Sequence, residues 1–228
     1  MQKLQEIQSN SEIKSKAYQL LKGRWSGPVI AFLLLMLISF IINILLSYLF
    51  FGGNLEETLQ DRDSFPFLNL AIYSLLQNSI TYCLSIGVII YFLNFIREKE
   101  TKYEMIFSGF KQFTQVLIAS ILMLIIIILG MLFFIIPGII ASLGLSQTFY
   151  ILADKPEISA IDALKESWEI TKGYRFKIFL LSISFIPWAV LCILTLGIGF
   201  LWLFPYMIAS LTILYTQLSA KENTLELV

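Results

Sequence analysis

The stretch Ile135-Ile136-Pro137-Gly138-Ile139-Ile140 lies in the middle of residues 112–153, a run without one charged side chain. As a single helix this run would be roughly 60 Å long at about 1.5 Å per residue, far more than the roughly 30 Å of bilayer hydrocarbon. Proline lacks the N–H that a helix interior uses, and glycine readily adopts positive φ. We therefore predict a helical hairpin across a membrane, with its turn at Pro137 and Gly138.

The composition of the whole chain is that of a membrane protein. Hydrophobic residues make up 57% of the sequence and charged residues 14%, against about 45–50% and about 25% in soluble proteins. The sequence contains no histidine, the commonest general base and metal ligand. The cysteines Cys83 and Cys192 both lie in apolar runs, which favours buried small side chains over a disulfide or a metal site.

Four uncharged runs predict six membrane spans. Runs 25–55 and 64–96 each hold one span, and runs 112–153 and 178–220 each hold two. The last run turns at Thr195-Leu196-Gly197-Ile198-Gly199, where Gly197 and Gly199 mark the reversal. The predicted fold is all-α: a polytopic membrane protein with six transmembrane helices paired as three hairpins. The spans lie near 27–50, 67–95, 114–136, 139–153, 177–195 and 199–219.

The distribution of Lys and Arg predicts the orientation of these spans. Fifteen of the sixteen basic residues fall in the N-terminal segment, in 97–111, in 154–177 and at Lys221. The 51–65 loop carries only Arg62, beside four acidic residues. Basic residues are retained on the cytoplasmic side, so both termini are expected to be cytoplasmic.

Each hairpin is predicted to follow an amphipathic helix that lies in the membrane interface with its apolar side down. Docking of a partner protein is the alternative use of these faces. Thr101 and Glu104 have the spacing of a capping box, and Asp154 and Glu157 have the same spacing. The three apolar faces consist of Ile13, Ala17, Leu20 and Leu21, of Tyr103, Ile106, Phe107, Phe110 and Phe113, and of Ile158, Ile161, Leu164 and Trp168. Their predicted hinges are Gly23, Gly109 and Gly173.

An internal repeat is consistent with this plan. Pro137-Gly138-Ile139-Ile140-Ala141-Ser142-Leu143 and Pro205-Tyr206-Met207-Ile208-Ala209-Ser210-Leu211 agree at five of seven positions. We predict one membrane domain, 1–228, of three repeat-like units at about 10–96, 100–153 and 156–220. Parallel units of this kind suit an arrangement around an axis along the membrane normal. Chance similarity between apolar segments is the alternative.

Polar side chains inside the predicted spans are the candidates for a path through the membrane. The span centres contain no Asp, Glu, Lys or Arg, which disfavours ion-coupled pumps. Hydrogen bonds between helices are the simpler use of the amides and hydroxyls, because an unpaired amide in lipid is costly. The candidates for lining a path are Asn43, Gln77, Asn78, Gln147 and Thr148.

A cluster of acidic residues offers one further hint of chemistry. Asp154, Asp162, Glu166 and Glu169 could serve acid–base catalysis or bind a hard cation. Lysines interspersed among them favour a solvated charged face instead. We therefore predict no catalytic residue, cofactor or metal site. A nucleic-acid partner is disfavoured as well, because the basic segments are short and suit anionic lipid.

Four groups of residues together resemble a known family. They are Ala17 with Leu21-Lys22-Gly23 and Trp25; Ile136-Pro137-Gly138-Ile139 with Tyr150-Ile151-Leu152-Ala153-Asp154; Ala163-Leu164 with Ser167 and Lys172-Gly173; and Thr195, Gly197-Ile198-Gly199, Leu201-Trp202 and Pro205-Tyr206. Over nearly its whole length the chain resembles the bacterial integral membrane family catalogued as domain of unknown function 975. The layout is also similar to the membrane domain of some glycerophosphodiester phosphodiesterases, without room for their catalytic domain. The resemblance implies a bacterial cytoplasmic membrane, of a Gram-positive organism, and no functional residues.

These observations favour a non-enzymatic multipass protein that acts by packing with a membrane partner or with lipid, with envelope homeostasis as a suitable setting. The alternative is a transporter, or a lipid- or peptide-handling protein, with a polar path between the hairpins. Membrane lipids and another membrane protein are the expected partners. A closed apolar centre would favour the first function, and a polar, laterally open centre the second.

Overall fold

The computed structural model describes residues 7–52 and 67–226, and within them the chain is helical without any strand. The predicted outer loop at 51–65 lies almost wholly outside the described residues. The first half of the chain contains α1 (Asn10–Leu21), α2 (Ser26–Phe51), α4 (Phe67–Ile96), η1 (Tyr103–Gln112) and α5 (Phe113–Phe133). The second half contains α6 (Ile135–Gly144), α7 (Thr148–Asp154), α8 (Ala160–Ile170), α9 (Arg175–Ile183), α10 (Ile186–Leu194) and α11 (Phe200–Glu226).

Six helices of the described chain are long and apolar enough to cross a membrane. They are α2, α4, η1 with α5, α6 with α7, α9 with α10, and α11. This confirms the predicted class, an all-α polytopic membrane protein. The membrane side on which each helix end lies stays a prediction from the basic residues.

The six helices alternate between two degrees of burial. Within the most apolar 18-residue stretch of each helix, 11% of α2, 11% of η1–α5 and 22% of α9–α10 is buried. In the same stretches, 56% of α4 and 50% of each of α6–α7 and α11 is buried. We call the first three the outer helices and the other three the inner helices. Each predicted hairpin therefore consists of one outer helix followed by one inner helix.

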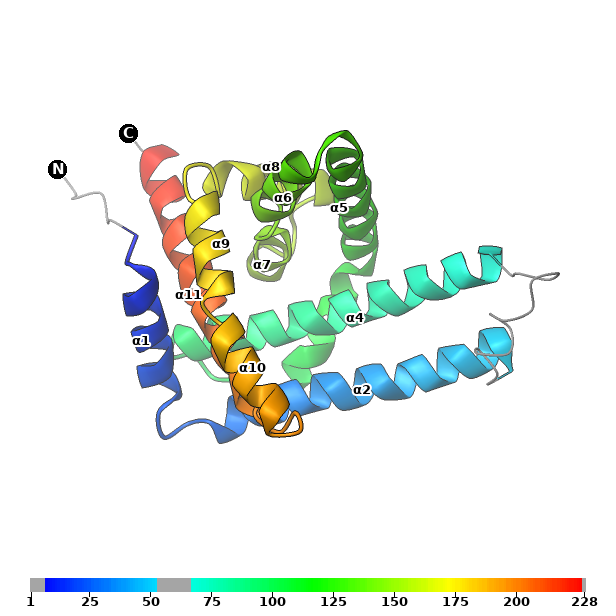
Figure 1. Cartoon of the computed structure of the whole chain (residues 1–228), viewed down its shortest axis with the longest axis horizontal. Helices are drawn as coiled ribbons and strands as arrows, with labels where there is room; N and C mark the ends of the chain where they lie inside the picture. The colour runs from blue at the N-terminus through cyan, green and yellow to red at the C-terminus, as the bar shows by residue number, and fades with distance from the viewer. Residues whose placement is uncertain (1–6, 53–66, 227–228) are drawn as a thin grey trace.

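The helices do not form a bundle of parallel rods. Figure 1 shows α2 and α4 side by side along the long axis, with α5, α9 and α11 running across it. The Phe204 ring of α11 stacks on Phe32 near the start of α2, with ring centroids 5.0 Å apart. Farther along α11, the Tyr215 hydroxyl reaches the carboxylate that pairs with Arg97, the residue after α4. Thus α11 crosses the same end of both α2 and α4, and the arrangement of three parallel repeats around a common axis stays a prediction.

The first amphipathic segment, α1, buries most of its predicted apolar face on protein. In α1, Ile13, Ala17 and Leu21 are fully buried, and the segment lies against α9 and α11. The N-terminus of α1 has a capping box, in which the side chains of Ser9 and Glu12 each accept a hydrogen bond from the other's backbone N–H. Placement of these segments in the membrane interface stays a prediction.

The segment η1 differs from the amphipathic α-helix predicted for it. It is a 3₁₀ helix, and Lys102 rather than Thr101 precedes it without a side-chain cap. Ile106 is fully buried, whereas Phe107 is about half exposed, so the predicted aromatic face is divided. Tight packing explains the geometry: a Cβ on Gly109 would lie 2.0 Å from the Cys83 carbonyl oxygen of α4.

The turn between α5 and α6 also lies at a different residue from the one predicted. The chain turns at Phe134, which is extended at φ −164° and ψ 154°, between α5 and α6. Pro137 belongs to the first turn of α6, where a missing N–H costs little. Gly138 is buried where α6 crosses α5, and a Cβ there would lie 3.0 Å from the Met131 nitrogen. The pair therefore supports a close helix crossing rather than the turn.

Candidate functional site

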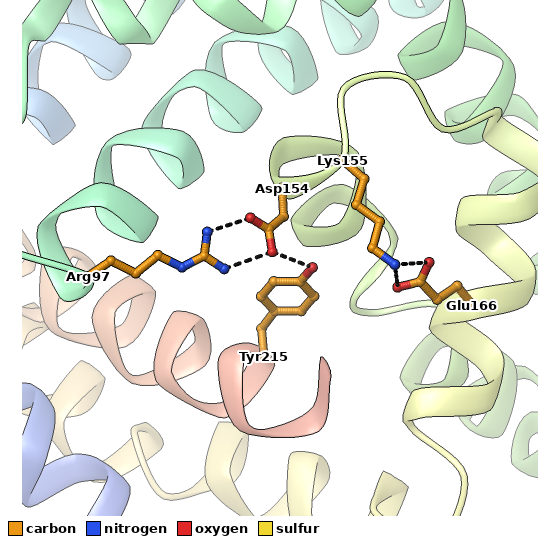
Figure 2. A network of polar contacts seen from close by, with 5 residues as sticks. All are labelled: Arg97, Asp154, Lys155, Glu166 and Tyr215. Atoms are coloured by element: carbon orange, nitrogen blue, oxygen red, sulfur yellow. Dashed lines mark hydrogen bonds and ion pairs between the residues drawn. The ribbon is translucent and has the colours of Figure 1, made fainter. Parts of the chain in front are cut away.

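The strongest polar cluster joins the three inner helices (Figure 2). Arg97 donates two hydrogen bonds to Asp154, from Nη1 to Oδ1 at 2.5 Å and from Nη2 to Oδ2 at 2.8 Å. The Tyr215 hydroxyl donates to Asp154 Oδ2 at 3.2 Å. The three residues follow α4, end α7 and lie within α11. One carboxylate thus fastens all three inner helices together.

The local fold explains why these side chains meet. Asp154 ends α7, where the helix dipole disfavours a negative charge, so a cationic partner is needed. Arg97 follows α4, and its own N–H still bonds the Leu93 carbonyl at 3.0 Å, which fixes where its side chain starts. The Tyr215 ring is fully buried and stacks on Tyr150 of α7, with centroids 5.6 Å apart.

The electrostatics of the cluster favour a permanent ion pair. The side chains of Arg97 and Asp154 are 35% and 18% exposed, so the pair is partly shielded from water. The hydrogen bonds to Asp154 raise the pKa of the Arg97 guanidinium above its usual value, more than desolvation lowers it. Both carboxylate oxygens of Asp154 already accept charge-assisted hydrogen bonds from Arg97. The geometry therefore suits a structural ion pair and leaves Asp154 poorly placed to act as a base.

A second ion pair lies beside the first. Lys155 Nζ donates to the two carboxylate oxygens of Glu166 at 2.9 and 2.8 Å, which ties the end of α7 to α8. Asp162 serves the N-terminus of α8 instead: its backbone N–H donates to the Ser159 hydroxyl, the actual N-cap. The predicted acidic cluster is therefore divided among separate partners. Within residues 7–52 and 67–226, no group of three His, Cys, Asp or Glu side chains could hold a metal.

The helix is interrupted at residues 145–147, between α6 and α7, and side chains at the C-terminal end of α8 hydrogen-bond the backbone there. The hydroxyls of Ser167 and Thr171 both donate to the Gly144 carbonyl, at 2.9 and 3.1 Å. Ser167 also accepts from the Gln147 N–H at 3.2 Å. Both hydroxyl residues are fully buried, and a Cβ on Gly144 would lie 2.5 Å from the Trp168 ring. A helix predicted to lie on lipid thus satisfies the broken backbone of an inner helix.

A comparison with family models now adds to the geometry. The model described as "Protein of unknown function (DUF975)" matches residues 1–141 and 123–222. The chain belongs to this family. The match confirms the resemblance expected from the sequence, and it brings no activity and no functional residues with it. Neither the comparison with curated proteins nor the comparison with solved structures gives a match.

The five polar residues predicted to line a path bond to separate partners in this DUF975 protein, where the structure shows a bond for them. Asn43 of α2 donates to the Tyr73 hydroxyl of α4 at 2.8 Å, which is a bond between two helices. Asn78 and Thr148 donate to backbone carbonyls in their own turns, those of Ser74 and Leu145. Gln147 donates to its neighbour Ser146 at 3.1 Å. Among the described residues, no bond joins any two of the five.

Two glutamines of that set have a polar atom without a partner. The side-chain oxygens of Gln77 and Gln147 are buried and lack a hydrogen bond within the described chain. Gln77 lies in the inner helix α4, and Gln147 lies in the break between α6 and α7. Of the five predicted residues, these two have a buried unpaired oxygen of the kind that a polar path would require.

The predicted hinge glycines of the DUF975 chain fall into two classes. Gly23 and Gly173 follow α1 and α8 with φ of +79° and +81°, and a Cβ at either would meet nothing within 4 Å. They are turns that favour glycine by conformation. Gly109 has no such φ and is selected by its contact with α4, so it is not equivalent to the other two. In the loop between α10 and α11, Gly197 has φ +87°, and a Cβ on Gly199 would lie 2.7 Å from Cys192 Sγ.

Sequence reasoning missed the Arg97–Asp154–Tyr215 cluster. The three residues are far apart in the chain, and each alone resembles an ordinary interface residue. The available signal was positional: Arg97 and Asp154 each directly follow a long apolar run. Opposite charges at the same end of neighbouring spans are natural partners. The Ser167 and Thr171 pair, at i and i+4 on the apolar face of a helix, was a similar signal for the helix break.

Proposed function

We propose that the protein is a non-enzymatic multipass membrane protein that acts by packing with a membrane partner or with lipid. The observation that carries the proposal is the division into inner and outer helices. The inner helices are joined to each other through Asp154, which pairs with Arg97 and accepts a hydrogen bond from Tyr215. The outer helices leave broad apolar faces free, as at Phe40 and Leu45 of α2, which are each 63% exposed.

The chemistry of the polar cluster supports the same proposal. Ion-coupled transport and acid–base catalysis need a group that exchanges protons or ligands during turnover. Asp154 is bound by Arg97 and Tyr215, and Glu166 is bound by Lys155. The Arg97–Asp154 pair joins α4 to α7 and the Lys155–Glu166 pair joins α7 to α8, so their plainest effect is to fix how these segments pack. A rigid core with apolar outer faces is a suitable scaffold for another membrane component.

We further propose that the protein resides in the bacterial cytoplasmic membrane with both termini in the cytoplasm. The distribution of the basic residues supports this orientation. Envelope homeostasis is a setting in which a scaffold without its own catalytic residues would be useful.

Photo-crosslinking in cells tests this function with a matched pair of aromatic positions. Benzoylphenylalanine at Phe40 samples an outer face, whereas the same residue at Phe92, fully buried in α4, samples the core. We expect Phe40 to give discrete adducts with a membrane protein or with lipid, and Phe92 to give only adducts within the chain. Equal adducts from both positions, or solute uptake by vesicles that hold only this protein, would overturn the proposal.

A transporter is the second candidate, and one feature favours it. Two of the six spans are broken, at residues 145–147 and near Ser184, and discontinuous helices often surround substrate sites. The unpaired oxygen of Gln147 lies at the first break. Against this, Ser167 and Thr171 already fill that break.

Thiol labelling separates the two candidates. In a variant with Cys83 and Cys192 replaced by serine, a cysteine at Gln147 would report on water access. A polar path predicts labelling by a membrane-impermeant thiol reagent, and a packed core predicts protection. An added cysteine at exposed Lys165 serves as the labelled control.

A further inference from the structure

An aromatic groove lies between α1, the residue before α2, helix α10 and the first turns of α11. Its cavity has a volume of about 290 Å³. Three of the four tryptophans of the chain line it, together with two tyrosines and a cysteine. The side chains that matter here are Tyr18, Trp25, Trp188, Cys192, Trp202 and Tyr206.

The groove is open rather than filled by the chain itself. Tyr18, Trp188 and Trp202 are each about half exposed although their rings line the cavity. The Tyr206 side chain is held in place by two contacts: its hydroxyl donates to the Lys14 carbonyl at 3.2 Å, and its ring packs edge-on against Phe185. Tryptophan and tyrosine favour the boundary between hydrocarbon and headgroups, where one end of the ring is apolar and the other is wet.

Basic residues lie next to the groove-lining residues in the chain. Lys14 precedes Tyr18 by one helical turn of α1, Lys22 is the C-cap four residues after Tyr18, and Arg24 directly precedes Trp25. The Lys14 ammonium lies 5.5 Å from the Phe185 ring centroid. Lys22 and Arg24 are exposed, and within the described residues neither side chain has an ion pair or a hydrogen bond. Of the residues that the structure describes, no acidic one lines the groove.

An apolar groove beside two free cations is complementary to an amphiphile with an anionic head. We propose that the groove holds one anionic glycerophospholipid of the bilayer, with an acyl chain against Trp188 and Trp202 and its phosphate on Lys22 and Arg24. Attraction between the phosphate and the basic side chains supplies selectivity, and aromatic contact supplies binding area. The inference rests on the proposed function only in that lipid is one of its two partner classes.

Tryptophan quenching by brominated lipid tests this site directly. The full chain is reconstituted in phosphatidylcholine vesicles that contain a small fraction of dibrominated phosphatidylglycerol or, separately, dibrominated phosphatidylcholine. The three groove tryptophans should be quenched far more by the anionic lipid at equal bromine content. Trp168 does not line the groove, and the Arg175 guanidinium lies 3.7 Å from its ring centroid, so its signal should not distinguish the two lipids.

Charge-matched variants complete the test. Lys22→Gln with Arg24→Gln should weaken the apparent affinity for the anionic lipid by roughly ten- to thirtyfold. Lys16→Gln with Lys99→Gln removes the same charge away from the groove and should leave the affinity unchanged. An unchanged elution profile in detergent confirms that each variant is folded.

Three outcomes would overturn the lipid site. They are equal quenching by the two brominated lipids, equal loss in both double variants, and no quenching by either lipid. The last result would indicate that protein covers the groove. The Phe40 crosslinks would persist in each of these cases if the protein packs on a membrane partner, so failure of this inference is distinguishable from failure of the proposed function.

Discussion

Helices α2 and α4 form one hairpin, yet they use their side chains in opposite ways. In their most apolar windows α2 is 11% buried and α4 is 56% buried, although α2 is the more apolar of the two. Helix α4 carries the consecutive polar residues Gln77, Asn78 and Ser79 in its first half, while α2 is almost uniformly aliphatic and aromatic. In this protein, the more polar helix is therefore the inner one.

The other two pairs repeat this relation, which is the reverse of the rule for soluble proteins. The outer helices η1–α5 and α9–α10 are also more apolar and less buried than the inner helices that follow them. Lipid tails are as apolar as leucine, so apolar side chains gain little by leaving lipid for the protein interior. Small residues, hydroxyls and ion pairs gain more there, because lipid gives them no partner.

The largest loss of stability is expected at the backbone contact between Gly109 of η1 and Cys83 of the inner helix α4. Gly109→Ala would place a Cβ 2.0 Å from the Cys83 carbonyl oxygen, and backbone cannot rotate away as a side chain can. We expect loss of the monodisperse species in detergent size exclusion. Gly52→Ala, at the end of outer helix α2, meets nothing within 4 Å and should cost only about 1–2 kcal/mol for its φ of +60°. Similar behaviour of the two variants would refute the tight α4–η1 contact.

A pair of leucines tests the comparison within one hairpin. Leu84→Ala in α4 removes a fully buried side chain and should lower the free energy of unfolding by about 2–5 kcal/mol. Leu45→Ala in α2, where the side chain is 63% exposed, should change it by less than about 0.5 kcal/mol. Thermal melting in one detergent measures both. Equal shifts would mean that α2 is an inner helix as well.

The ion pair between the inner helices should be the next largest contribution. Asp154→Asn leaves Arg97 without its partner, and we expect a loss of about 2–3 kcal/mol, below the value for fully buried pairs because both groups are partly exposed. A double-mutant cycle with Arg97→Gln should show positive coupling. Lys165→Gln breaks only the exposed 3.7 Å pair with Asp162 and serves as the control, with almost no change. Absence of coupling in the cycle would contradict a stabilising ion pair between Arg97 and Asp154.

The smallest effect concerns a single hydroxyl. Tyr215→Phe removes the 3.2 Å hydrogen bond to Asp154 and should cost about 1 kcal/mol, measured by the same melting experiment. Tyr48→Phe on α2, where the ring is 70% exposed, is the matched change on an outer helix and should be neutral. If Tyr215→Phe proved neutral too, Asp154 would join two inner helices rather than three.

Much of the fold could be predicted from the sequence because membrane helices are decided locally. Runs such as 112–153 exceed one span and lack charges, so only paired helices satisfy their backbone groups in lipid. The six helices follow from that constraint, as does the turn around Gly197. Positions that depend on a contact did not follow. Pro137 and Gly138 look like a turn in the sequence, but they serve a helix crossing because Met131 lies against them.

What the sequence determined by itself was the class of protein, its helices and its family, since apolar run length and turn residues act over a few neighbouring positions. Only the tertiary structure decided which helices are inner and how α11 crosses the end of the first hairpin. It alone brought Arg97, Asp154 and Tyr215 to one point and placed Ser167 and Thr171 in the break of another helix. Those outcomes depend on partners far apart in the chain. In lipid, where apolar burial discriminates little, such specific polar and close contacts select the arrangement.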